Sequence, residues 1–402
     1  MRNASSGEPS LQTAPIPLDG PVRVLHICRR YRPFAGGTEK YVHDLACAQV
    51  AAGRKVTVLT LDRDIAGPTR GLPHRETIDG IDVVRVPGRG GAQIAITYRP
   101  DRIWREIARH DVVHIHDLRF ALATTVLGAA LRRRPRVFHT HGLIFHSAGG
   151  SRLKHLAVRL YFGPWLRLCG VRVVADSPTD RMLLLRDAPY LAERTVVYLN
   201  AIPLAPLLGL SRQPIPGRVV SIGRMVPNKA LSDLVRALAL IADIDWSLLL
   251  AGEKDDEEVG RIKALAGDLG VESRVDFLHD FDEDALPGIL GSAALAAFPS
   301  KGEGFGIALL EAMAAGVPLV ANRIPAHVAL LGPDLEERLT DFGEPEAASS
   351  AIRGAMSLGL RESAELSARL KQRALGYDVS RLLHEIDDLY VRLGVGSHRA
   401  RG

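Results

Sequence analysis

The 402 residues are 47% hydrophobic and 24% charged, a globular composition in a chain long enough for two domains. No apolar run reaches the roughly 18–20 residues needed to span a bilayer. The three cysteines, Cys28, Cys47 and Cys169, are odd in number and widely spaced. This pattern argues against a disulfide framework or a zinc site and favours a reducing cytosol.

The net charge of +5 is unevenly divided along the chain. Residues 1–200 carry 30 Lys and Arg against 17 Asp and Glu, a net charge of +13, whereas the remainder carries 21 against 29, or −8. Between Asp117 and Asp176 there are ten Lys and Arg and no acidic residue. We therefore expect the first half to meet an anionic surface or ligand.

Short β-rich runs alternate with helical patterns from about residue 21. Residues 1–20 contain Ser, Pro and Gly but no apolar signal core, so we expect a disordered extension and not a signal peptide. Residues 38–53 are apolar at helical spacing and end at a glycine. Seven strands are predicted in the first half, at 22–28, 55–61, 81–87, 111–117, 136–142, 171–177 and 195–200.

The same rhythm restarts after residues 200–217, which hold four prolines and are predicted to link two domains. We predict five strands in the second half, at 218–224, 247–253, 274–280, 294–300 and 318–323. One helix is expected from about Lys229, and a final amphipathic helix is expected at 379–393. The expected organisation is an α/β chain of two doubly wound, Rossmann-like domains, 21–199 and 218–377. A C-terminal helix, 378–394, follows and could return to the first domain.

In such sheets, ligands bind outside the carboxyl ends of the strands, and the informative motifs occur there. Gly36 and Gly37 follow the first strand and precede the first helix. Glycines there let the backbone approach an anionic ligand, although an ordinary turn would look the same. His139, His141 and Gly142 end the strand "FHTHG". Two histidines at this spacing point the same way, but no third metal ligand is evident, so a substrate contact or a structural histidine is favoured over a metal.

Two further motifs follow strands of the second domain. Arg224 and Lys229, in "GRMVPNK", place two cations beside a helix start, which suits a diphosphate, although they could be solvated surface charges. In "PSKGEGFGIALLEAMAAGVP", the N–H groups of Phe305, Gly306 and Ile307 can begin a helix that holds a phosphate or a hydroxyl. Carboxylates accept hydrogen bonds from pairs of hydroxyls, so Glu303 and Glu311 suit a sugar nucleotide.

These motifs, in this order over residues 22–393, resemble the retaining family-4 glycosyltransferases with the GT-B fold, whose signature is E-x7-E. The resemblance implies two domains facing across a cleft, a nucleotide-sugar donor and no metal or other cofactor. It implies that Gly36, Gly37 and the amides of Phe305, Gly306 and Ile307 help to bind the donor. His141 and Glu303 would contact the transferred sugar, Arg224 and Lys229 the diphosphate, and Glu311 the ribose. The usual Lys-Gly pair of the family is Lys229-Ala230 here, and the usual NG[VI]D motif is "NAIP".

Four segments also resemble the mannosyltransferases of xanthan-type exopolysaccharide assembly: "HTHGLIFHSAGGSRLKHL", "GRMVPNKAL", "EGFGIA" and "RIPAHVALL". This likeness implies GDP-mannose as donor and a lipid-linked oligosaccharide as acceptor, with no nucleic acid as partner. It also implies that the protein acts at the inner, cytoplasmic face of the plasma membrane. A UDP-sugar donor (glucose or N-acetylglucosamine), a sugar-nucleotide epimerase and a silent membrane-bound binding protein remain alternatives.

Residues 151–170 interleave cations with apolar side chains and contain no acid. Such a segment can lie in the headgroup region of an anionic membrane surface, although the apolar residues could equally form the domain core. The side chains predicted to face the membrane are Arg152, Lys154, Arg159, Phe162 and Trp165.

Overall fold

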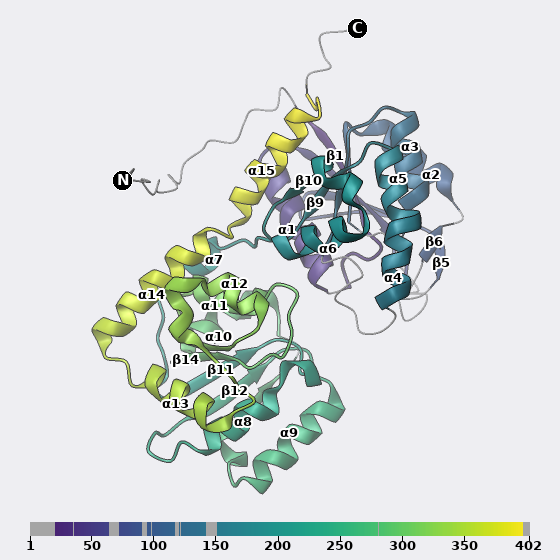
Figure 1. Ribbon diagram of the computed structural model, residues 1–402. Coiled ribbons are helices and arrows are strands. Elements are labelled where there is room, and N and C mark those ends of the chain that lie inside the picture. Colours follow the sequence, from purple (N-terminus) through teal and green to yellow (C-terminus); the bar gives the residue numbers. More distant parts are fainter. Residues whose placement is uncertain are drawn as a thin grey trace, which may run out of the picture. The chain divides into compact units, whose positions relative to one another are not determined.

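A computed structural model of the chain (Figure 1) describes residues 21–34, 36–63, 72–90, 95–97, 99–116, 120, 122–141, 151–279 and 281–396. The predicted N-terminal extension and Gly142 lie outside the described residues. The chain divides into two compact units: unit 1 is residues 1–201 with 379–402, and unit 2 is residues 202–378. None of the described helices is both long and apolar enough to cross a bilayer.

Unit 1 is built on a sheet with the strand order β10-β9-β8-β7-β1-β2-β4-β3, parallel except for the pair β3–β4. The strands are β1 (Arg23–Ile27), β2 (Lys55–Leu61), β3 (Arg75–Ile78), β4 (Ile81–Val86), β7 (Val112–Ile115), β8 (Arg136–His139), β9 (Arg172–Ala175) and β10 (Thr195–Val197). A separate hairpin pairs β5 (Gly88–Gly90) with β6 (Ala95–Thr97).

The alternation of side chains along β1 shows how the sheet is covered on both faces. Leu25 and Ile27 belong to one core, whereas Val24 belongs to the core on the other face. Helices α1 (Gly37–Ala51) and α15 (Val379–Arg392) pack on the Val24 face. The opposite face carries α2 (Pro100–Arg109), α3 (Leu122–Leu131), α4 (Ser151–Ala157), a π-helical turn η1 (Val158–Phe162), α5 (Gly163–Leu168) and α6 (Pro178–Asp187) (Figure 1).

Unit 2 repeats the architecture with a parallel sheet in the order β13-β12-β11-β14-β15-β16. The strands are β11 (Arg218–Ile222), β12 (Ser247–Ala251), β13 (Val275–Leu278), β14 (Leu295–Phe298), β15 (Leu319–Asn322) and β16 (Leu339–Thr340). The helices are α7 (Ala205–Leu208), α8 (Leu231–Ala239), α9 (Asp256–Asp268), α10 (Leu286–Ser292), α11 (Ile307–Ala314), α12 (Pro325–Leu331), α13 (Pro345–Met356) and α14 (Leu360–Leu375). The strand order reverses at β11 and β14, where doubly wound sheets bind their ligands.

The proline-rich stretch predicted as a linker packs on unit 2 from Ile202 onward. Ile202 forms a bridge with Asp378, and the N–H groups of Gln213 and Ile215 donate to the carbonyls of Gly291 and Ser292. These hydrogen bonds tie the stretch to α10, so it is not an extended tether over its whole length.

Candidate active site

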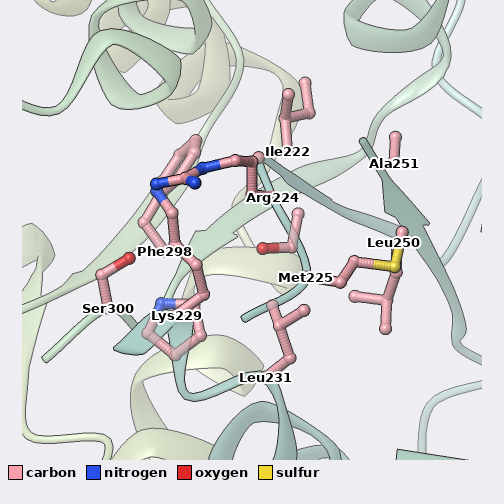
Figure 2. A pocket seen from close by; sticks show the side chains of 12 residues that line it. Ile222, Arg224, Met225, Lys229, Leu231, Leu250, Ala251, Phe298 and Ser300 are labelled. Atoms are coloured by element: carbon pink, nitrogen blue, oxygen red, sulfur yellow. The ribbon is translucent and has the colours of Figure 1, made fainter. Parts of the chain in front are cut away.

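A pocket opens at the carboxyl ends of β11 and β14 in unit 2. Figure 2 shows the nitrogen atoms of Arg224 and Lys229 on the same side of it as the hydroxyl of Ser300. Arg224 is exposed, whereas Lys229 is partly buried. The remaining lining is mainly apolar: Ile222, Met225, Leu231, Leu250, Ala251, Phe298 and Pro299, with Ser221 and Gly223.

Lys229 and Glu303 form a direct ion pair beside this pocket. Lys229 Nζ donates to Glu303 Oε1 at 2.5 Å, and Ser300 Oγ donates to the same oxygen at 2.8 Å. The two charged side chains retain 20% and 18% of their exposure, so both can still be reached by a ligand. The pair shows that one predicted phosphate contact and one predicted sugar contact lie together.

The loop that carries Glu303 is held by Asn228 on the N-terminal side of the glutamate. Asn228 Nδ2 donates to the carbonyl of Gly302 at 2.5 Å, and the N–H of Lys301 donates to the carbonyl of Asn228 at 2.9 Å. Farther on, Gly306 adopts a left-handed φ of 93° and begins α11. The first N–H groups of α11 have no partners within the helix and can bind an anion.

Glu311 lies one turn into α11 and is buried, with 8% of its area exposed. Phe305, by contrast, is partly buried and packs its ring 5.8 Å from that of Tyr377. Behind the loop, Asn322 Nδ2 donates to the carbonyl of Ser300 at 3.0 Å, which fixes the end of β14 under the ion pair.

The predicted histidine of unit 1, His141, follows β8 and adopts a left-handed φ of 45°. Such a backbone is uncommon for a residue with a side chain and costs about 1–2 kcal/mol, so the surroundings must hold it in place. His141 Nε2 lies 2.9 Å from His116 Nδ1, and its Nδ1 lies 3.9 Å from a carboxylate oxygen of Asp176. Asp176 also bonds His139 Nε2 at 2.6 Å.

His116 is the third histidine that the motif "FHTHG" lacked. One nitrogen each from His116, His139 and His141 lies within 4.8 Å of the others, and His26, His114 and His116 form a similar group. Within each group the ring planes are inclined by 28° or less. An imidazole binds a metal along a lone pair in the plane of its ring, so nearly parallel rings do not aim at one ion. The geometry therefore favours hydrogen bonding over metal binding.

Gly36 and Gly37 lie where α1 begins, at the carboxyl end of β1. A Cβ on Gly36 would collide with the carboxylate of Glu39, which stands in the first turn of the helix. At Gly37 a Cβ would meet no atom within 4 Å. Glu39 is a flexible side chain that can turn away, so close packing requires glycine at neither position.

Comparison with known proteins agrees with this architecture. Residues 35–205 match the model named Glycosyltransferase Family 4, and residues 214–375 match the model named Glycosyl transferases group 1. The chain belongs to the family-4 glycosyltransferases.

Two relatives match nearly the whole glycosyltransferase. The GDP-mannose:cellobiosyl-diphosphopolyprenol alpha-mannosyltransferase of Komagataeibacter xylinus is 28% identical over 92% of this chain and 93% of its own. The phosphatidyl-myo-inositol mannosyltransferase of Mycolicibacterium smegmatis is also 28% identical, with the same coverage. Among solved structures, Anabaena HepE in complex with UDP and glucose has a TM-score of 0.71 at 20% identity, over 92% of this chain and 100% of that one. This likeness supports the GT-B fold.

The glycosyltransferase places its basic segment differently from the prediction. Phe162 and Trp165 are partly buried and pack against the core of unit 1, because they lie on the inner side of the helical segment. The side chains on the outer side include Arg152 and Arg159, whereas that of Lys154 lies outside the described residues. Among the described side chains of this segment, the large apolar ones that are exposed are instead Leu156, Leu160, Tyr161 and Leu168.

Sequence reasoning did not find Ser300, Asn228, His116 or His26 in this glycosyltransferase. Ser300 and Asn228 lie within two of the sequence motifs, but the sequence does not indicate that their side chains hold the Glu303 loop. For the histidines a signal existed: "VLHIC", "VVHIHD" and "FHTHG" each place His near the end of a strand. In the sheet, β1 pairs with β7 and β7 pairs with β8, which brings the three motifs together.

Proposed function

We propose that this glycosyltransferase transfers mannose from GDP-mannose, with retention of the α configuration, to an oligosaccharide linked to polyprenyl diphosphate. The observation that carries the proposal is the cluster of Arg224, Lys229 and Glu303 at the carboxyl ends of β11 and β14. A relative with that donor and acceptor in its name matches more than nine-tenths of the chain and supports the choice of substrates.

In the proposed reaction the guanidinium of Arg224 and the ammonium of Lys229 neutralise the diphosphate as it leaves. The N–H groups at the start of α11 add donors that face developing negative charge. In this proposal, the two cations and the backbone amides supply the stabilisation that a divalent ion would otherwise give. We therefore expect transfer without a metal ion or another cofactor.

Glu303 is suited to orient the sugar and not to attack it. Its Oε1 already accepts hydrogen bonds from Lys229 and Ser300, which lowers its nucleophilicity and fixes its direction. We propose that Glu303 accepts hydrogen bonds from sugar hydroxyls, that Glu311 binds the ribose and that His141 contacts the transferred sugar. Retention then follows from attack on the same face that the diphosphate leaves, with a leaving-group oxygen accepting the proton of the acceptor hydroxyl.

The second candidate is the same reaction with a UDP-sugar, glucose or N-acetylglucosamine, and another acceptor. HepE, which shares the fold, was solved with UDP and glucose, and the mycobacterial relative is named for a different acceptor. A sugar-nucleotide epimerase would convert its donor without an acceptor. A silent binding protein would not need the ion pair of Lys229 and Glu303.

Product analysis decides among these possibilities. The purified chain is incubated with cellobiosyl-diphosphopolyprenol and, separately, GDP-mannose, UDP-glucose and UDP-N-acetylglucosamine, with and without EDTA. We expect one added mannose by mass and an α anomer by NMR, only with GDP-mannose and unchanged by EDTA. Transfer from a UDP-sugar would reassign the donor, and conversion without acceptor would indicate an epimerase. Loss of activity in EDTA, restored by a metal, would contradict metal independence.

We also propose that unit 1 attaches peripherally to the inner, cytoplasmic face of the plasma membrane during exopolysaccharide synthesis. The support is the coincidence of exposed leucines, such as Leu160 and Leu168 at 66% and 81%, with exposed Arg159 and Arg167 on one helical segment. Apolar side chains beside cations match the headgroup region of an anionic bilayer. A polyprenyl acceptor keeps its tail in that bilayer, so attachment would bring enzyme and acceptor together.

A further inference from the structure

Three histidines of unit 1 form a hydrogen-bonded row that ends at His141. Gln49 Oε1 lies 2.7 Å from His26 Nε2, His26 Nδ1 lies 2.8 Å from His116 Nε2, and His116 Nδ1 lies 2.9 Å from His141 Nε2. Gln49 and His26 have no exposed area, and His116 has 3%. The row therefore leads from the interior of unit 1 to a residue proposed to contact substrate.

Two further histidines, His139 and His114, stack beside the row and have polar partners of their own. Tyr41 of α1 bonds His139, and Asp176 after β9 bonds His139 Nε2 at 2.6 Å. On the α15 side, Tyr390 OH lies 2.9 Å from Nδ1 of His114, a ring stacked on both His26 and His116. Burial lowers the pKa of His26 to about 4 and that of His116 well below its ordinary value, so both rings are neutral near pH 7.

Neutral imidazoles in such a row cannot choose their tautomers independently. The oxygen of Gln49 only accepts, so His26 Nε2 must carry a proton and His26 Nδ1 must be an acceptor. His116 then donates from Nε2 and accepts at Nδ1, and His141 in turn donates from Nε2. A neutral His141 is thereby left with an unprotonated Nδ1, the nitrogen that lies on the side of Asp176.

We propose that Gln49, His26 and His116 are positioning residues that fix the ring plane and the Nε2–H tautomer of His141. The tautomer presents Nδ1 as a hydrogen-bond acceptor for a hydroxyl of the substrate, and Asp176 stabilises the ring whenever it takes up a proton. The left-handed backbone of His141 is consistent with a side chain held in a set direction by this row. The inference rests on the proposed sugar contact of His141.

Gln49 offers a matched pair of variants. Gln49→Met keeps the shape and removes the acceptor, whereas Gln49→Glu keeps an acceptor at the end of the row. In the full chain labelled with 15N-histidine, the His141 signals are assigned by their loss in His141→Gln. We expect the Nε2–H tautomer in the wild type and in Gln49→Glu, and a mixture of tautomers in Gln49→Met and His116→Phe. Nitrogen shifts of His141 that are identical in all folded variants would overturn the proposal.

Kinetics with the donor that product analysis identifies give the second readout. We expect Gln49→Met to lower kcat by about tenfold with little change in KM for the donor, and Gln49→Glu to restore it. Equal losses in both variants would contradict the assigned direction of the row. Full activity of His141→Gln would remove the proposed sugar contact, while the nitrogen shifts would still decide the coupling. If the wild type contains stoichiometric zinc and His116→Phe does not, the histidines form a metal site and the proposed hydrogen-bonded row is wrong.

Discussion

Lys229 Nζ and Glu303 Oε1 lie 2.5 Å apart although 74 positions separate the two residues in the sequence. The contact joins the loop after β11 to the loop after β14, the two neighbouring strands at which the order of the sheet reverses. In the absence of donor, each charge neutralises the other. A donor that presents a diphosphate and a sugar would supply both side chains with new partners at once.

Substitution of Glu303 and substitution of Lys229 should therefore change nucleotide binding in opposite directions. Glu303→Gln removes the competing negative charge, so we expect GDP to bind as tightly or more tightly while transfer falls by about a hundredfold. Lys229→Met should weaken GDP binding, because a charge-assisted contact of this kind is worth about 2–4 kcal/mol. Calorimetry with GDP and transfer rates with GDP-mannose measure the two effects.

Lys301 provides the control for the lysine variant. It lies in the same loop as Glu303 but pairs with Asp233 and is largely exposed. Lys301→Met should leave both binding and transfer unchanged. Near-normal transfer by Glu303→Gln would remove Glu303 from the reaction, and equal GDP affinities of wild type and Lys229→Met would remove Lys229 from the phosphate site.

Unit 2 should gain stability when Ala230 is replaced by glycine. Its backbone is left-handed, with φ of 51° and ψ of 36°, which strains any residue that carries a Cβ. We expect Ala230→Gly to raise the free energy of unfolding of unit 2 by about 1 kcal/mol in urea titrations, with unchanged transfer. Ala237→Gly, in the interior of α8, is the matched control and should lower it by a similar amount. Destabilisation by both substitutions would show that Ala230 is not strained.

Unit 1 should lose stability below pH 6.5. Burial holds the folded-state pKa of His26 at about 4 and those of His114 and His116 well below normal, whereas the unfolded chain takes up protons near pH 6.5. Stability contributed by the neutral rings is complete above pH 6.5 and declines as the pH falls toward 4. Each histidine adds about 1.4 kcal/mol per pH unit to this decline.

Urea unfolding at pH 7.5 and 5.5 measures that slope. His114→Leu should reduce the slope of unfolding free energy against pH by roughly the contribution of one histidine. The control is His74→Gln, at an exposed position of the same unit, which should leave the slope unaltered. An unchanged slope in a folded His114→Leu protein would mean that the buried histidines are already protonated in the native state.

The exposed leucines of α5 and η1 should control vesicle binding. We expect the double substitution Leu160→Ser and Leu168→Ser to weaken partition to anionic vesicles by about tenfold. Each serine would bury less apolar surface in the bilayer than the leucine it replaces. Transfer to a long polyprenyl acceptor should slow more than transfer to a short-chain analogue. Higher salt should weaken the binding of the wild type, as screening of Arg159 and Arg167 requires.

Leu240 and Leu360, which are exposed in unit 2, form the matched double control. Their replacement by Ser should not change vesicle binding. Equal binding by both double variants and the wild type would show that the membrane is contacted elsewhere or not at all.

The sequence predicted most of the fold because buried parallel strands are continuous apolar runs. All twelve strands expected from such runs are present. It missed β3, whose residues Arg75–Ile78 form an exposed edge, and the short β5, β6 and β16. Such strands are defined by their neighbours and not by their own side chains. The outer face of residues 151–168 was also missed, since the π-helical turn at Val158–Phe162 shifts the phase of a 3.6-residue pattern.

The site was predictable residue by residue but not as a set of contacts. The positions of Arg224, Lys229 and Glu303 after strands indicated a ligand, yet their pairing depends on side-chain torsions and on Asn228 and Ser300. The row of histidines depends on which strands are neighbours, and strand order is a property of the whole sheet.

The position of α15 has a consequence for the order in which the protein can fold. Leu382, Ile386 and Tyr390 are buried in the core of unit 1, and Asp387 pairs with Arg54 in that interior. All four residues are synthesised after the whole of unit 2. Unit 2 is thus complete on the ribosome while the α1 face of the unit 1 sheet still lacks its last helix. In chains that end before residue 379, α1 should cover that face alone, and Arg54 should lack the carboxylate of Asp387 as its partner.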